Sequence, residues 1–312
     1  MTKAIFTTKV SPSYDDIPEV RYHFPRTYLR QAEQTVGDWI VYYEPRRPSA
    51  DLMKTGGRQA YFATARVDRI VPDPRLTEHF YAEMSGYLEF TRPVPFREGS
   101  FFYEGALEKT DGSTNKGAFG RAVRLLPDKE YDLIWHAGFG PIIGLDHPTN
   151  VDLSIPEELP LVAEAHTPFF GVEAMTEDRR IVEQLVSRPF RDRAFAVAVK
   201  SAYEDTCAVT GFKIINGGGR SEVQAAHIRP VADMGPDSVR NGIALSGTIH
   251  WMFDRGLLAV DDDYSLLVAK ELVPEAAMRL LPPDLRLRLP SRDELRPHPA
   301  FLAHHRETYF KG

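Results

Sequence analysis

The chain lacks several features that would place it in a specialised class of proteins. It has one cysteine, Cys207, in 312 residues, so it can form no internal disulfide, which fits a reducing cytoplasm. No apolar run approaches the roughly 18 residues that a membrane span requires. The first ten residues, MTKAIFTTKV, lack the uninterrupted apolar core of a signal peptide. We therefore expect a cytoplasmic protein with no membrane partner.

What is present is ordinary for a globular protein. Apolar residues make up 43% of the chain and charged residues 26%, and the length is sufficient for two domains. The first part contains short alternating or β-rich runs between clusters of Pro, Gly and Asp, which predict strands at Trp39 to Tyr43, Tyr61 to Ile70 and Tyr87 to Phe90. Helices are expected from Thr176 to Val186, with Thr176 as N-cap, and from Pro189 to about Ser201.

Proline divides the sequence near its middle. Residues 141–175 are dotted with prolines, beginning with Pro141, and they predict a linker. We therefore expect an α+β protein with a β-rich domain at 1–140 and a second domain at 176–312.

The most informative segment covers residues 224–256. His227 ends a predicted strand, Asn241 follows an irregular loop, and His250 and Asp254 stand at positions i and i+4 of a predicted helix. This spacing puts the last two side chains on one helical face. An imidazole and a carboxylate placed there form part of a coordination sphere for a divalent ion, with the remaining positions left to water and a phosphate oxygen. The pattern indicates a hydrolytic metal site.

The motifs AAHIRP, Asn-Gly and HxxFDRGL in this order resemble the HNH, or ββα-metal, endonucleases over residues 203 to 260. The resemblance implies a one-metal phosphodiesterase in which His227 is the general base. It also implies that Asn241 holds the loop and orients the base, and that His250 binds the metal. The expected ion is Mg, Mn, Co or Ni. Asp254 stands where relatives often provide another ligand.

The sequence departs from the family pattern in two places. Ala226 replaces the acidic or His ligand that many relatives carry just before the base, so the ion would depend on His250 and Asp254, with Gln224 as a further candidate. Many relatives also bind zinc between two Cys pairs. Here the four positions are Cys207, Thr210, Ser246 and Ile249, so we expect no structural zinc.

The net charge of −6 does not exclude a DNA partner, because phosphate binding needs only a local basic face. Residues 176–256 contain eleven Lys or Arg against ten Asp or Glu, so this segment is slightly basic within an acidic chain. The candidates for DNA-phosphate contacts are Arg188, Arg191, Arg193, Arg220, Arg229 and Arg240. A solvated surface with ion pairs is the alternative interpretation.

The N-terminal domain contains further recognisable motifs, which are GDWIVYYEP (37–45), AYFATARVDRIVPDP (60–74), YHFPRTYL (22–29) and NKGAFGRAVRLL (115–126). They resemble the EVE domains of the PUA superfamily, and their order before an HNH unit resembles the EVE-HNH endonucleases. The resemblance implies a PUA/EVE-like β-barrel that reads a modified base, joined to a ββα-metal nuclease with flanking helices. The expected partner is double-stranded DNA with 5-methylcytosine or 5-hydroxymethylcytosine.

Reading such a base would require flipping it out of the duplex and stacking it on aromatic rings. Most aromatic side chains of a half-buried sheet belong to the core, so only some can line a pocket. We favour Tyr22, Trp39 and Tyr43 as stacking residues, with His23 or Asp38 reading the base edge.

Three classes of function stay open at this point. The leading one is a modification-dependent endonuclease, the second a nuclease that ignores modification, and the third an inactive binding module, which Ala226 would favour. A homodimer is one expected assembly, because one HNH site cuts one strand. The apolar stripe formed by Ile181, Val182, Leu185 and Val186 could pair across a two-fold axis or pack on its own domain.

Overall fold

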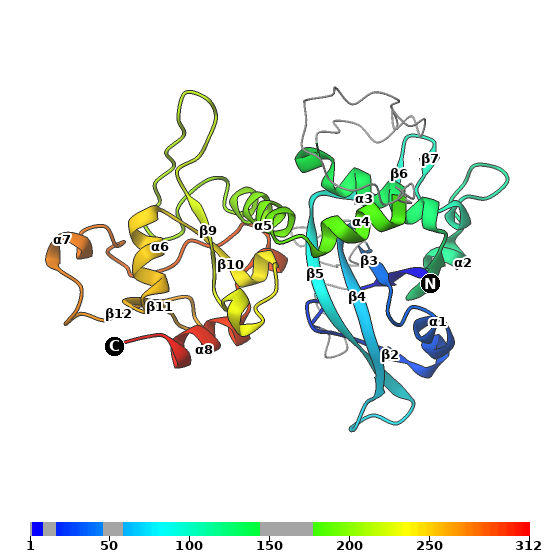
Figure 1. Ribbon diagram of the computed structural model, residues 1–312, viewed down its shortest axis with the longest axis horizontal. Helices are drawn as coiled ribbons and strands as arrows, with labels where there is room; N and C mark the ends of the chain where they lie inside the picture. The colour runs from blue at the N-terminus through cyan, green and yellow to red at the C-terminus, as the bar shows by residue number, and fades with distance from the viewer. Residues whose placement is uncertain (1, 9–16, 46–58, 144–176) are drawn as a thin grey trace, which may run out of the picture.

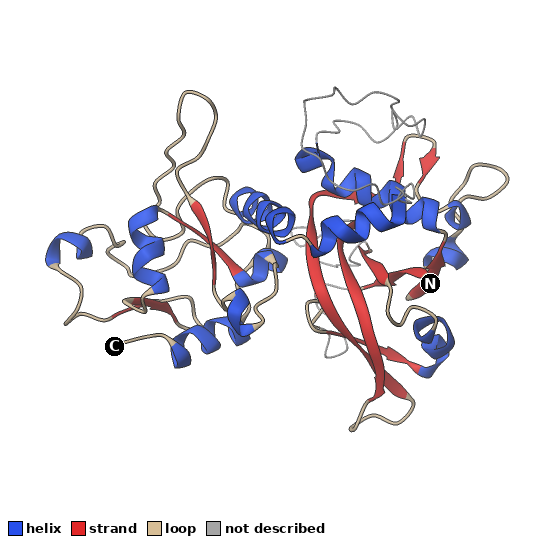
Figure 2. Ribbon diagram, viewed as in Figure 1, coloured by secondary structure: helices blue, strands red, loops and turns tan. Residues whose placement is uncertain are grey.

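The computed structural model describes residues 2–8, 17–45, 59–143 and 177–312, which form two units side by side (Figure 1). Strands dominate the N-terminal unit, while the C-terminal unit mixes helices with short strand pairs (Figure 2). The predicted α+β class is confirmed. Within the described ranges, no helix is both long and apolar enough to span a membrane.

A six-stranded sheet forms the N-terminal unit. In spatial order its strands are β2 (Arg21–Pro25), β5 (His79–Pro95), β4 (Ala60–Pro72), β3 (Trp39–Glu44), β1 (Lys3–Thr7) and β8 (Val123–Leu126). Strands β1 and β3 run parallel, and the other neighbours are antiparallel. The sheet curls so far that Tyr22, on edge strand β2, donates from its hydroxyl to the Thr7 carbonyl at the other end of the sheet. This half-barrel is compatible with the predicted PUA/EVE-like barrel, whose identity stays a prediction.

Short elements surround this sheet. They are α1 (Leu29–Glu33), β6 (Arg97–Glu98), β7 (Phe101–Phe102), α2 (Lys116–Phe119) and the 3-10 helices Arg26–Tyr28 and Gly105–Leu107.

Both faces of β3 are buried, because residues that alternate along this strand enter two different cores. Trp39, Val41 and Tyr43 pack with helix α3 (Asp128–Ile143) on one face. Tyr42, on the opposite face, packs inside the curl with Tyr22. The strand therefore has no solvent-facing side, which explains why its sequence is almost continuously apolar.

Helix α3 extends past the predicted domain boundary. It includes Pro141 in its last turn and ends at Ile143, so the first proline of the predicted linker is helical. A proline near the C-terminal end removes one backbone hydrogen bond but leaves the preceding turns intact. The rest of the predicted linker, residues 144–175, lies outside the described residues, as does the predicted N-cap Thr176.

Helix α4 (Glu177–Val186) packs on its own chain. Ile181 and Leu185 are buried in the same core as Trp135 of α3, and Val182 lies against that core. Val186, in contrast, is 66% exposed. Most of the apolar stripe is therefore covered within the chain, which favours the intramolecular alternative over pairing across a two-fold axis.

The C-terminal unit begins with α5 (Arg188–Ala202), which starts at Arg188 with Pro189 in its first turn. The nuclease motifs follow on β9 (Gln224–His227), β10 (Gly242–Leu245) and α6 (Gly247–Asp254). The remaining elements are β11 (Leu258–Val260), β12 (Leu266–Val268), α7 (Glu275–Met278), α8 (Pro299–Thr308) and the 3-10 helices Val231–Asp233, Val239–Asn241 and Asp293–Leu295. One apolar core joins α5, both strand pairs, α6 and α8.

Strand β10 approaches α5 closely at Gly242. A Cβ atom there would lie 2.4 Å from a methyl carbon of Val199 and 3.0 Å from the ring of Phe195. We expect Gly242→Ala to lower the free energy of unfolding by about 1 to 3 kcal/mol, because overpacking forces the strand away from the helix. Urea denaturation measures this. Gly247→Ala is the control, since its Cβ would meet no atom nearer than 3.9 Å. Equal stabilities of the two variants would contradict the close contact.

Candidate functional site

A ββα unit holds the predicted nuclease residues. Strands β9 and β10 pair antiparallel, with His227 opposite Gly242, and α6 follows β10 after the N-cap residue Ser246. In the pleated strand β9, Ala226 is fully buried in the core, whereas His227 on the other face is partly exposed. The residue just before the candidate base therefore points into the core and away from the pocket.

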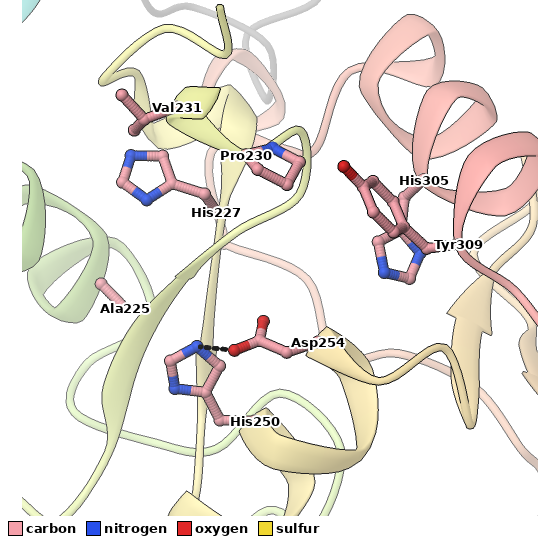
Figure 3. A pocket seen from close by; sticks show the side chains of 8 residues that line it. All are labelled: Ala225, His227, Pro230, Val231, His250, Asp254, His305 and Tyr309. Atoms are coloured by element: carbon pink, nitrogen blue, oxygen red, sulfur yellow. Dashed lines mark ion pairs between the residues drawn. The ribbon is translucent and has the colours of Figure 1, made fainter. Parts of the chain in front are cut away.

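One pocket of about 400 Å³ collects the candidate catalytic side chains (Figure 3). His227 comes from β9, His250 and Asp254 come from α6, and Tyr309 follows α8 at the opposite wall. The lining residues are Ala225, His227, Pro230, Val231, His250, Asp254, His305 and Tyr309. The spacing in the sequence thus brings the two histidines and the carboxylate to one cavity.

The imidazole of His227 is held on two sides. Its Nε2 lies 2.9 Å from Oδ1 of Asp237, and its ring stacks on Phe195 of α5 with 3.8 Å between centroids. A carboxylate only accepts hydrogen bonds, so Nε2 carries the shared proton. With Nε2 bonded to Asp237, Nδ1 is the ring nitrogen that would accept a proton from water.

Asn241 organises the loop between the two strands. Its buried amide accepts from the backbone N–H of Arg229 at 2.8 Å and donates to the carbonyls of Arg229 and Pro236, both at 2.9 Å. It therefore fixes the two ends of the loop to each other. Asp237, not Asn241, makes the side-chain hydrogen bond to the imidazole.

His250 and Asp254 form the candidate metal-binding pair. Nε2 of His250 lies 3.4 Å from Oδ2 of Asp254, and Nδ1 lies 2.7 Å from the side-chain oxygen of Gln224. Across the described ranges, no group of three or more His, Cys, Asp or Glu side chains is arranged to hold an ion. Two protein ligands do fit a catalytic divalent ion that completes its sphere with water and phosphate oxygens.

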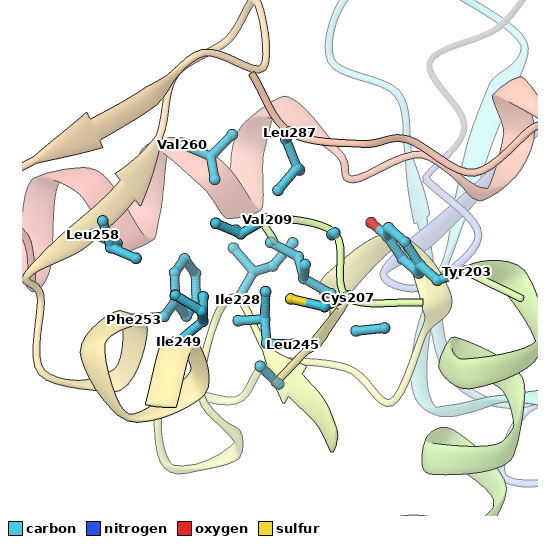
Figure 4. Packing of buried hydrophobic residues seen from close by; sticks show 14 of the residues in the cluster. Tyr203, Cys207, Val209, Ile228, Leu245, Ile249, Phe253, Leu258, Val260 and Leu287 are labelled. Atoms are coloured by element: carbon cyan, nitrogen blue, oxygen red, sulfur yellow. The ribbon is translucent and has the colours of Figure 1, made fainter. Parts of the chain in front are cut away.

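The four positions that relatives use for zinc do meet in space, but hydrogen bonds and apolar packing occupy the site. The sulfur of Cys207 accepts from the backbone N–H of Thr210 at 3.4 Å and of Ser246 at 3.3 Å. Ile249 packs in the surrounding core with Leu245 (Figure 4).

The candidate phosphate-binding arginines divide into two groups. Arg191 bonds to Asp237 and to backbone carbonyls, Arg188 pairs with both oxygens of Asp237, and Arg240 pairs with Glu19. These three form ion pairs with carboxylates of the protein, which agrees with the alternative interpretation, and their contacts with phosphate stay a prediction. Arg229 donates to the Asp233 carbonyl, while Arg193 and Arg220 are exposed.

The structure does not bring the five predicted base-reading residues into one pocket. Tyr22 lies on the opposite face of the sheet from Trp39 and Tyr43, so the three cannot stack on one base. Asp38 is buried and bonds to Lys3 at 2.7 Å. His23 pairs with Asp73 at 2.8 Å.

Trp39 instead lines a cavity of about 350 Å³ at the junction of the two units. Its neighbours there include Arg66 and Gly86 from the sheet, Val186 from α4, and Arg188, Arg191 and Asp237.

Asp237 is a site residue that the sequence did not predict. Its carboxylate is 2% exposed and accepts hydrogen bonds from His227, Arg188 and Arg191. Burial alone would raise the pKa of Asp237, but the hydrogen bond with His227 and the charges of Arg191 and Arg188 lower it to about 2. Its position in an irregular loop gives no periodic signal. An acidic residue between the candidate base and Asn241 is the only available hint.

Residues 207–261 match the HNH endonuclease family HNH_2. The chain therefore contains an HNH endonuclease domain and is a nuclease. The match covers the ββα unit described above, including His227, Asn241, His250 and Asp254.

Comparison with solved structures finds weaker similarities. One is to a structure described as the modification dependent TagI restriction endonuclease, with a TM-score of 0.30 and 13% identity over 97% of this chain and 80% of that chain. Another is to the Type IV phosphorothioation-dependent restriction endonuclease ScoMcrA, with a TM-score of 0.20 and 14% identity over 98% of this chain and 52% of that chain. Such scores establish no shared fold. No curated protein sequence matches the chain.

The pKa of Asp237 predicts an acid-dependent loss of stability. A carboxyl group whose pKa is lowered from 3.8 to about 2 on folding stabilises the folded state above pH 4. This contribution, about 2 kcal/mol, is lost as the pH falls through 2. Urea denaturation should therefore show a smaller loss between pH 5 and pH 2 for Asp237→Asn than for the wild type. Parallel slopes for the variant and the wild type would contradict the lowered pKa.

Proposed function

We propose that the chain is a modification-dependent DNA endonuclease that cleaves DNA containing 5-methylcytosine or 5-hydroxymethylcytosine. The observation that carries the nuclease mechanism is the convergence of His227, His250 and Asp254 on one pocket. The resemblance of the N-terminal motifs to EVE domains supports modification dependence. The expected partner is double-stranded DNA.

In the proposed mechanism, Nδ1 of His227 accepts a proton from the attacking water while Nε2 stays bonded to Asp237. Asn241 keeps the loop in place behind the imidazole. His250 and Asp254 would hold a divalent ion, Mg, Mn, Co or Ni, which stabilises negative charge on the phosphate and the leaving oxygen when bound.

His227→Ala should lower the cleavage rate by roughly a hundred- to ten-thousandfold and leave DNA affinity within about threefold of wild type, because it removes a proton acceptor and no phosphate contact. Nicking of plasmid DNA measures the first property and fluorescence anisotropy the second. The matched control is His136→Ala, on the N-terminal helix α3, which should cleave at the wild-type rate. Undiminished nicking by His227→Ala would refute the role as base.

Intact DNA with the wild-type protein and each of the four metals would select the inactive binding module.

The junction cavity is the structural feature that best suits a reader of a flipped base. It is lined by Trp39, Arg66 and Arg188, and its volume of about 350 Å³ lies within the range of small-molecule sites. Aromatic stacking and a nearby cation are the contacts that nucleobases use in proteins. We therefore propose this cavity as the reading pocket. Of the five residues predicted to read the base, it includes Trp39.

A second candidate function is a nuclease that cleaves DNA without reading modification. The burial of Tyr22, Asp38 and Tyr43 favours it, because these side chains are used in the two cores and in an ion pair. In that case the N-terminal unit serves only for docking on DNA.

The variant Val186→Trp separates the two functions. Val186 lines the junction cavity but is 66% exposed, so a larger side chain there fills the cavity without disturbing a core. We expect the preference for modified DNA to fall by roughly ten- to a hundredfold, which corresponds to one lost stacking contact. The affinity for unmodified DNA should stay unchanged. The substrates are otherwise identical duplexes with cytosine, 5-methylcytosine, 5-hydroxymethylcytosine or its glucosylated form.

Leu76→Trp is the matched control, since Leu76 is 48% exposed in the turn between β4 and β5. It should retain the wild-type preference. Equal cleavage of all four substrates by the wild type would select the second candidate. A preference that survives in Val186→Trp would remove the cavity as the reading site.

A further inference from the structure

Arg191 joins the N-terminal sheet to the support of the candidate base. Its Nε donates to Asp237 Oδ2 at 2.7 Å. Its terminal nitrogens donate to the carbonyl oxygens of Gly86 at 2.9 Å and Tyr87 at 2.8 Å, both in β5. The side chain is 12% exposed, so it holds this position inside the protein. One guanidinium therefore links β5 to the carboxylate that binds His227.

The loop around Asp237 has two more contacts with the N-terminal unit. Glu19, which is buried, accepts a hydrogen bond from the Ser238 hydroxyl at 3.0 Å and pairs with Arg240 at 3.4 Å. The backbone of Asp237 also forms a parallel bridge with Leu88 of β5. Backbone and side chains thus attach the loop to the N-terminal unit at Asp237 itself and at two residues that follow it, Ser238 and Arg240.

We propose that Asp237 is the positioning residue of His227, and that the N-terminal unit sets its position through Arg191 and Glu19. This inference rests on the proposed role of His227 as general base. The N-terminal unit then does more than bring DNA to the nuclease, because it completes the support of the imidazole.

Helix α5 supports both the imidazole of His227 and the carboxylate of Asp237, so its position determines theirs. Arg191 and Phe195 are one turn apart on α5, where the first bonds to Asp237 and the second stacks on the His227 ring. A movement of α5 against β5 would shift both supports together. Rates fall by about a hundredfold when a reacting group is misplaced by about 1 Å.

The junction cavity lies beside the same residues. Arg188, Arg191 and Asp237 all line it, together with Trp39. A base or phosphate that enters this cavity would contact the side chains that hold Asp237. Occupancy on the N-terminal side therefore has a direct physical route to the base.

The first test uses Asp237→Asn in the full chain. At saturating DNA and Mn²⁺, its single-turnover cleavage rate should fall about 10- to 100-fold, with DNA affinity within about threefold. In a His227→Ala background the same substitution should change the residual rate by less than about twofold, because its effect passes through the imidazole. The control Asp233→Asn removes a carboxylate of the same loop that binds His304 and Tyr309, and it should stay within about threefold of wild type.

The second test addresses the link to the N-terminal unit. Arg191→Lys keeps the charge but cannot reach the carboxylate and two carbonyls together, and Glu19→Gln weakens the second attachment. Each should lower the cleavage rate by roughly tenfold without weakening DNA binding. Glu78→Gln, which removes an exposed ion pair with Arg26, is the control and should have no effect. Thermal unfolding of every variant shows whether it is folded.

A spectroscopic measurement makes the outcome independent of cleavage. In protein with ¹⁵N-labelled histidine, the His227 ring should be mainly the Nε2–H tautomer, and Asp237→Asn should shift it toward a mixture. His227→Ala identifies the signal. Wild-type cleavage by His227→Ala would remove the proposed role of His227 as base, while the tautomer shift would still test whether Asp237 positions the ring.

Four results would overturn the inference itself. One is an unchanged tautomer and an unchanged rate in Asp237→Asn. Another is an equal loss from that substitution in both backgrounds, which would mean a general structural role. The third is normal cleavage by both Arg191→Lys and Glu19→Gln. The fourth is that Arg191→Lys weakens DNA binding instead of cleavage, as the loss of a phosphate contact would.

Discussion

The carboxylate of Asp237 lies where α5, β5 and the nuclease loop meet, and much of the arrangement depends on keeping it charged there. A buried carboxylate is strongly destabilising without partners, and here Arg188, Arg191 and His227 compensate for it. Arg191 is held in turn by carbonyl groups of β5. One set of charge-assisted hydrogen bonds therefore contributes both to the contact between the two units and to the position of the candidate base.

Local features of the nuclease unit could be predicted from the sequence. The i, i+4 relation of His250 and Asp254 and the strand ending at His227 depend only on helix and strand periodicity. The contacts of Asp237 could not be predicted in this way, because its partners are 10, 46 and 49 residues distant in the chain. The partners of the arginines could not be predicted either, since a basic side chain on a helix can face DNA or a buried carboxylate equally well.

In the N-terminal unit, the sequence predicts where strands lie but not which of their faces are exposed. Alternation along β3 separates Trp39 and Tyr43 from Tyr42, but whether either face is free depends on α3 and on the curl of the sheet. The apolar stripe of α4 was equally ambiguous, because the same residues serve a dimer interface or an internal core. Only the position of α3 beside it settles that Ile181 and Leu185 face inward.

The hydrogen bonds around Cys207 have a consequence for how the nuclease unit responds to chelators. In relatives with a zinc between Cys pairs, stripping the metal removes part of the folding free energy along with it. Here Thr210, Ser246 and the core beside Ile249 support the same corner of the ββα unit. Among the described residues of this unit, chelation would then act on the ion proposed for His250 and Asp254. The apoprotein would remain folded, and different divalent ions could be exchanged into one native structure.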